Sequence, residues 1–168
     1  GGGSIGRAFD LFKYFFPNEF PYSGTRFRRS DAMDSIVLGL QDTDSEGNIL
    51  PFYWKSQVKP NQEEDFQSVE EFLDGGDQLD TKVSSLFANF NYTLLSTDPT
   101  YEINGFGAST INKTQPFKAE DILIMTDGVC ASTCTTFVNL MTNVGGVRAI
   151  TFGGRPQLKP MQVMGGVR

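Results

Sequence analysis

Histidine is absent from this 168-residue chain. A catalytic centre whose general base is a histidine is therefore excluded within these residues. Cysteine is almost as scarce, because the chain has two, Cys130 and Cys134, four positions apart. A zinc site needs further cysteines or histidines near such a pair, so we predict no bound metal. Nothing in the sequence predicts a cofactor.

Long apolar runs and an excess of basic residues are also missing. No apolar run approaches the roughly 18 residues that cross a bilayer, so we predict no membrane span. The chain has 14 Lys and Arg against 20 Asp and Glu, a formal net charge of −6. This acidic balance disfavours nucleic acid as the main partner. The sequence says nothing of the oligomeric state.

The chain has no initiator methionine and no signal-peptide pattern at its start. It opens GGGSIGRAFDLF and closes MQVMGGVR. We therefore interpret it as a fragment of a longer chain. A residue type that is missing here is then not excluded from the whole protein.

The first two thirds of the sequence contain helix and loop signals. Amphipathic spacing predicts helices at 4–16, capped by Ser4, and at 30–41. Residues 42–118 are rich in turn chemistry, such as DTDSEGN and NGFGAST, with one short helix predicted at 66–75. We predict that this region is a loop-rich insertion that packs on the core.

The last third predicts a strand, a helix and a second strand. Residues 122–126 and 147–152 are short apolar runs that end in turn residues, and STCTTFVNLMTN between them has helical spacing. We expect two buried, adjacent, parallel strands joined by a right-handed crossover through the helix. The predicted fold class is α/β with a mostly parallel sheet.

Ser132 follows the first of these strands and stands at the start of the helix. Ligand sites of parallel sheets lie at the carboxyl ends of the strands. A helix start also offers unpaired N–H groups, that of Thr133 being nearest, to an oxyanion. Two hypotheses follow: Ser132 is a nucleophile on an elbow-like turn, or it is only the cap of the helix. The opening GGG introduces another helix and could supply the second half of an oxyanion hole.

The compartment is indicated by two glycosylation sequons, at Asn91 and Asn112. Cys130 and Cys134 could pair with each other, pair with partners outside these residues, or stay free and buried. Together these features predict a secreted glycoprotein, modified at Asn91, Asn112 or both.

Four blocks of the sequence share a family resemblance. GGGS with its helix, DILIMTDGVCASTCTTF, VRAITFGGRP and MQVMGG resemble the tail-specific, or C-terminal-processing, serine proteases, and are most similar to the fungal secreted branch. The resemblance covers residues 1–16 and 119–166. It implies a crotonase/ClpP-like core of repeated β-β-α units, in which residues 1–168 are a single peptidase core domain with an insertion at about 42–118.

The resemblance also implies roles for individual residues. It aligns Ser132 with the nucleophile, and Thr133 and Gly3 with the residues whose N–H groups form the oxyanion hole. Lys159 falls near the position of a lysine base found in much of the family, although Pro160 follows it where glycine is usual. Such a lysine must be buried to be neutral, and the ordinary interpretation of Lys159 is a surface lysine.

The general base therefore stays open between Lys159 and a histidine outside this chain. Another branch of the family uses an upstream histidine and a downstream glutamate, and we favour that case. The isolated 168 residues would then be nearly inactive. We predict a serine-type peptidase, an endopeptidase core that cleaves a polypeptide substrate by acyl transfer. The alternatives are a non-catalytic module that binds hydrophobic ligands or peptides, and a crotonase-like acyl-CoA enzyme.

Overall fold

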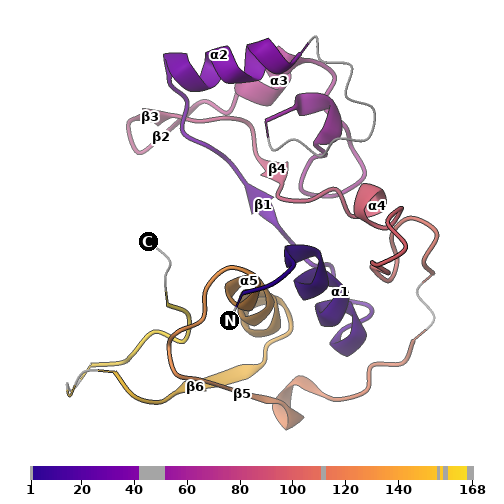
Figure 1. The fold of residues 1–168 in the computed structure, drawn as a ribbon, viewed down its shortest axis with the longest axis vertical. Coiled ribbons are helices and arrows are strands. Elements are labelled where there is room, and N and C mark those ends of the chain that lie inside the picture. The colour runs from indigo at the N-terminus through magenta and orange to yellow at the C-terminus, as the bar shows by residue number, and fades with distance from the viewer. Residues whose placement is uncertain (1, 42–51, 111–112, 155, 157–158, 166–168) are drawn as a thin grey trace. The chain divides into compact units, whose positions relative to one another are not determined.

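The chain folds into two compact units of mixed α/β structure (Figure 1). The computed structural model describes residues 2–41, 52–110, 113–154, 156 and 159–165. One unit comprises residues 1–21 with 94–168, and the other comprises residues 22–93. The predicted single core domain with an insertion at about 42–118 stays a prediction.

The first unit begins with the predicted amphipathic helix, α1, at Ile5–Phe15. Its apolar face is buried as the spacing predicts, with Phe9 and Phe12 almost completely enclosed. Ser4 occupies the N-cap position, but its side chain makes no cap hydrogen bond. The Ser4 hydroxyl bonds instead to the Tyr101 hydroxyl. The predicted capping by Ser4 is therefore wrong, because a distant tyrosine takes its hydroxyl.

Two charged side chains of α1 are buried, which the helical pattern did not predict. Asp10 accepts a hydrogen bond from Arg7 at 2.9 Å, and Lys13 donates one to the carbonyl of Glu19, also at 2.9 Å. Burial lowers the pKa of Lys13. Both charges thus have a partner inside the unit, as burial of charge requires.

The predicted strand–helix–strand segment is present in the first unit. Strands β5 (Leu123–Thr126) and β6 (Arg148–Thr151) form a parallel pair in register, Leu123 opposite Arg148. Helix α5 (Thr133–Asn139) lies between them in the chain and continues into a π-helical turn, η3 (Leu140–Val144). The predicted parallel pairing is confirmed. A short 3-10 helix, η2 (Ala119–Asp121), precedes β5.

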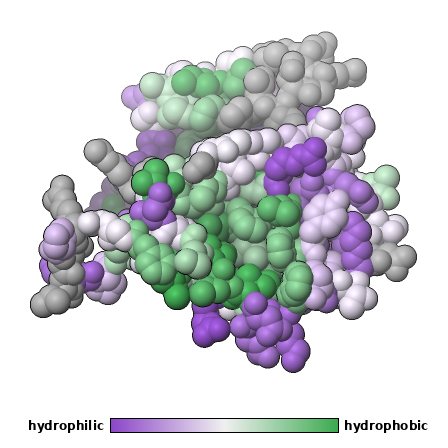
Figure 2. Space-filling model, turned by 60° about the horizontal axis from the view of Figure 1, so that its bottom comes forward, coloured by the Kyte–Doolittle hydropathy of each residue, from purple (hydrophilic) through white to green (hydrophobic). Residues whose placement is uncertain are grey.

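The two parallel strands are less buried than predicted. Alternate side chains of both strands are exposed, with Met125 at 64% and Ile150 at 43% exposed. Leu123 and Phe152 share this alternation and are exposed as well. The parallel sheet of the described residues has two strands, so one of its faces is left to solvent. Figure 2, which brings forward the side that carries β5 and β6 in Figure 1, shows an apolar area on it.

The second unit contains the predicted helices α2 (Asp31–Leu40) and α3 (Val69–Leu73). Ser30 caps α2, accepting the Met33 N–H at 3.3 Å. Helix α3 is shorter than the predicted 66–75, because Ser68 accepts the Glu71 N–H and so sets its start. A short 3-10 helix, η1 (Trp54–Ser56), precedes α3, and α4 (Tyr92–Leu95) lies at the boundary of the two units along the chain.

Both small sheets of the second unit are antiparallel. Strand β1 (Gly24–Thr25) pairs with β4 (Phe87–Ala88), and β2 (Asp77–Gln78) pairs with β3 (Thr81–Lys82). The predicted mostly parallel sheet is thus confirmed for β5 and β6 alone among the described strands.

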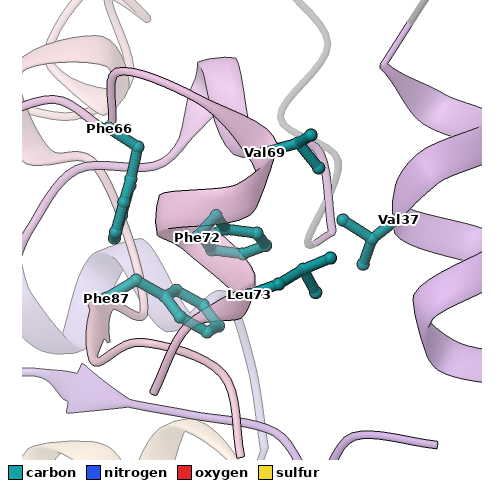
Figure 3. Close-up of a cluster of buried hydrophobic side chains, with 6 residues drawn as sticks. All are labelled: Val37, Phe66, Val69, Phe72, Leu73 and Phe87. Carbon is teal, nitrogen blue, oxygen red and sulfur yellow. The ribbon is translucent and has the colours of Figure 1, made fainter. Parts of the chain in front are cut away.

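The core of the second unit is an apolar cluster between α2, α3 and β4 (Figure 3). Its buried members are Val37, Phe66, Val69, Phe72, Leu73 and Phe87. Phe52 and Trp54 pack against this cluster. In the part of the chain that the structure describes, no helix is long and apolar enough to cross a membrane.

Candidate active site

The backbone at Ser132 is in a conformation that side chains rarely adopt. Its φ is 56° and its ψ is −129°, close to a region that is otherwise used almost only by glycine. Such a conformation costs on the order of 1–3 kcal/mol, and residues that keep it cluster at functional sites. The turn after β5 therefore has the strained character of a nucleophile elbow.

The Ser132 side chain does not act as a helix cap. Ser132 occupies the N-cap position of α5 and its carbonyl accepts the Thr136 N–H at 3.1 Å. Its side chain makes no cap hydrogen bond, and the residue is exposed. This favours the nucleophile hypothesis over the cap hypothesis, because capping by serine acts through the side-chain oxygen.

The amino-terminal glycines lie beside this turn. Thr133 Oγ1 donates a hydrogen bond of 2.6 Å to the carbonyl oxygen of Gly3. Figure 1 accordingly shows the indigo segment that precedes α1 beside α5. Helices α1 and α5 pack together along the same unit, with the rings of Phe15 and Phe137 6.3 Å apart. The two residues proposed to form an oxyanion hole, Gly3 and Thr133, are thus in contact.

The carboxyl-terminal segment packs against the turn that follows β5. Thr126 Oγ1 donates to the Val163 carbonyl at 2.7 Å and accepts the Gly128 N–H at 3.2 Å. Gly128 has a φ of +79°, and a Cβ added there would lie 2.3 Å from Cε of Met161. The positive φ therefore favours glycine at position 128, and a larger residue there would also displace the end of the Met161 side chain. The segment from β5 to α5 is thus in contact with both the block around Gly3 and the block around Met161.

A disulfide brackets the serine. Cys130 and Cys134 are bonded to each other, with their Cα atoms 5.2 Å apart. Cys130 is buried, and its carbonyl accepts the Thr135 hydroxyl at 2.8 Å. The turn that carries Ser132 is therefore closed by one covalent bond and one hydrogen bond.

Lys159 lies exposed at the surface, as does Pro160 after it. A lysine base has to lose its proton, which burial favours and exposure does not. Asn91 is half-buried, whereas Asn112 lies outside the described residues. Among the described residues, no group of three or more histidine, cysteine, aspartate or glutamate side chains is placed to hold a metal ion.

Sequence reasoning missed the side chains that anchor the amino-terminal segment. The sequence indicates a role for the N–H group of Thr133, but not for its hydroxyl, which bonds to Gly3. Tyr101 had no predicted role, although it bonds to Ser4. Both contacts join residues about a hundred or more positions apart, so no local pattern could have indicated them.

Comparison with known proteins shows that the chain is similar to three fungal proteins. It is 37% identical over 175 residues to the peptidase S41 family protein ustP of Aspergillus flavus, covering 98% of this chain and 36% of that protein. It is 38% identical to the peptidase S41 family proteins phomP1′ and phomP1 of Diaporthe leptostromiformis, over 100% and 99% of this chain and 26% of each protein.

The chain spans 36% or less of the length of these curated relatives. No family model matches it, and no solved structure matches it. The relatives nevertheless cover nearly the whole chain, and so they confirm the family resemblance that the glycine and serine blocks predict. Over nearly its whole length, the chain is thus similar to a part of three proteins that are named as members of the peptidase S41 family.

Proposed function

We propose that these residues form the serine-bearing part of a peptidase that cleaves polypeptides by acyl transfer. Ser132 is the nucleophile, and the N–H groups of Thr133 and Gly3 form the oxyanion hole. The observation that carries the proposal is the backbone of Ser132, which holds an exposed hydroxyl on a strained turn before a helix. The relatives, which are named as peptidases, support peptide hydrolysis.

The proposed reaction follows from these positions. A general base takes the proton of Ser132 Oγ, and Oγ attacks the carbonyl carbon of the scissile peptide bond. The Thr133 and Gly3 N–H groups stabilise the negative oxygen that forms, and each such donor is worth about 10²–10³ in rate. The protonated base then gives its proton to the leaving amine. Water, activated by the same base, hydrolyses the acyl-enzyme and frees the serine.

The base in this proposal is a histidine outside the chain or Lys159. The exposure of Lys159 favours the histidine. The chain itself has no histidine, and it spans at most 36% of the relatives' length, so the proposal assigns this role to a residue outside these 168.

Two broader features of the proposal rest on the same residues. The parallel pair β5 and β6, joined through α5, supports a crotonase/ClpP-like core. The disulfide between Cys130 and Cys134 supports secretion, because disulfides persist in oxidising compartments. The exposed serine elbow argues against the two alternatives, since neither a binding module nor an acyl-CoA enzyme of the crotonase type needs a serine nucleophile.

The test uses the full-length protein that contains these residues. Ser132→Ala should abolish both peptide hydrolysis and covalent labelling by a fluorophosphonate, while circular dichroism stays unchanged. Ser35→Ala, at an exposed serine of α2 in the second unit, is the matched control and should leave both intact. Hydrolysis that persists undiminished in Ser132→Ala would refute the serine-peptidase proposal.

The identity of the base is tested by Lys159→Ala in the same protein. If a histidine is the base, hydrolysis should change little. If Lys159 is the base, its loss should reduce the rate by orders of magnitude, nearly as much as loss of Ser132, because nucleophile and base act as one unit.

A further inference from the structure

The two halves of the proposed oxyanion hole are joined by a side-chain hydroxyl. Thr133 is the first residue of α5, and its Oγ1 donates to the Gly3 carbonyl at 2.6 Å. The two residues are 130 positions apart. A threonine at a helix start would ordinarily bond to backbone nearby in the sequence. Here the hydroxyl serves a tertiary contact instead.

This hydrogen bond restricts the position of the Gly3 N–H. The Gly3 carbonyl lies in the peptide plane that Gly3 shares with Ser4, and the Gly3 Cα lies in the same plane. Holding the carbonyl therefore locates the atom to which the Gly3 nitrogen is attached. Two torsions then separate the held plane from the N–H, and glycine has more freedom in them than any other residue. The anchor is thus most needed at a glycine.

A second contact anchors the neighbouring residue, Ser4. The Ser4 hydroxyl bonds to the Tyr101 hydroxyl, and the Arg7 guanidinium lies 5.2 Å from the centre of the Tyr101 ring. The ring also lies so close to Gly6 that a Cβ there would be 2.7 Å from Cε1. Tyr101 therefore fixes the start of α1, and Thr133 fixes that start relative to the serine turn.

We propose that the Thr133 hydroxyl is a positioning group that sets the spacing between the Gly3 and Thr133 N–H groups. The inference rests on the proposed function. An oxyanion hole acts only when both donors lie about 2.7–3.1 Å from the developing oxyanion. A misplacement of about 1 Å lowers the rate on the order of 10²-fold. A hydroxyl that ties the two backbone segments together directly controls this spacing.

The experiment compares two substitutions of one residue in the full-length protein. Thr133→Val keeps the shape of the side chain and removes the hydroxyl, whereas Thr133→Ser keeps the hydroxyl. We expect Thr133→Val to lower kcat by roughly 10- to 100-fold with KM within about twofold of wild type, since the hole acts in the transition state. Thr133→Ser should restore kcat to within about threefold.

Thr142→Val is the matched control. The Thr142 hydroxyl donates to the Val138 carbonyl at 2.9 Å within its own helix, so its loss should not affect kcat. The rate of fluorophosphonate labelling of Ser132 should follow kcat in all variants, because phosphonylation also develops charge in the hole.

Three results would overturn the inference: a wild-type kcat in Thr133→Val, a Thr133→Ser variant as slow as Thr133→Val, or a rise in KM with kcat unchanged. The second would show that a retained hydroxyl does not preserve the rate, so the hydrogen bond to Gly3 would not be what sets kcat. If Ser132→Ala retains full hydrolysis, the proposed function and this inference fail together. If hydrolysis depends on Ser132 but not on the Thr133 hydroxyl, this inference alone fails.

Discussion

At the scale of single residues, Ser132 has a backbone conformation and a side-chain environment that differ from those of an ordinary serine cap. Serine is a favoured helix cap, yet the side chain here makes no cap bond and the backbone adopts a φ of 56°. A conformation of this kind persists only where the surrounding structure enforces it. The disulfide and the Thr135 hydrogen bond supply that enforcement on either side of the serine.

The strain at Ser132 gives a prediction about stability that is independent of activity. Ser132→Gly and Ser132→Ala both remove the nucleophile, but only glycine relieves the strained backbone. Relief of the strain stabilises the folded state by about 1–3 kcal/mol. Glycine offsets roughly 0.5–1 kcal/mol of this, because it loses more conformational entropy on folding than alanine does. We expect Ser132→Gly to have a free energy of unfolding about 1 kcal/mol above that of Ser132→Ala. Urea unfolding of both variants measures this, and equal stabilities would contradict a strained serine.

At the scale of elements, helices follow the sequence pattern closely. Helix α1 lies within the predicted 4–16, and α2 lies within the predicted 30–41. Helical periodicity depends on residues within about four positions, so a sequence contains it, whereas the capping predicted for Ser4 gives way to a tertiary contact with Tyr101. Strands β5 and β6 were also predicted, but their exposure was not, because burial depends on what covers a sheet.

The element that joins β5 to α5 provides a prediction about the disulfide. Cys130 and Cys134 close a very short loop, for which the chain-entropy relation gives about 2 kcal/mol of stabilisation. The double variant Cys130→Ala with Cys134→Ala should therefore unfold with about 2 kcal/mol less free energy. Its peptidase activity should fall as well, because the turn that holds Ser132 loses its covalent closure.

Unfolding in the presence and absence of a thiol reductant checks this prediction. Reductant should lower the stability of the wild type towards that of the double variant and leave the variant unchanged. Equal sensitivity of both proteins to reductant would show that the disulfide between Cys130 and Cys134 is not what stabilises the turn.

At the scale of the whole molecule, the proposed functional residues belong to one of the two units. Residues 1–21 and 94–168 contain Gly3, Ser132, Thr133 and Lys159, and residues 22–93 form the other unit around its own apolar cluster. The proposed peptidase site is thus assembled from the two ends of the chain. The second unit has a hydrophobic core of its own, which includes the fully buried Phe72.

The proposed secretion of the whole protein is tested by its glycosylation. Protein secreted from a eukaryotic host should carry a glycan at Asn91, Asn112 or both, since both stand in sequons. Mass spectrometry before and after glycosidase treatment gives the site and the mass. The substitutions Thr93→Ala and Thr114→Ala remove each sequon in turn and serve as controls. Two unmodified asparagines in secreted protein would remove the sequons as support for this localisation.

The sequence by itself determined helices α1, α2 and α5, the parallel strand pair and the placement of Ser132 between a strand and a helix. These features depend on periodicity, capping and turn chemistry within a few residues. The sequence also indicates the family resemblance, because the glycine and serine blocks can be recognised without a structure.

Only the tertiary structure decided which partner each of several side chains bonds to. It paired Cys130 with Cys134, turned Ser4 towards Tyr101 and brought Gly3 to Thr133. The last two contacts join residues that are 97 and 130 positions apart. A local sequence pattern cannot predict which residues such long loops bring together. The strained backbone of Ser132 is also a product of tertiary structure, because the surrounding contacts hold a conformation that serine rarely adopts.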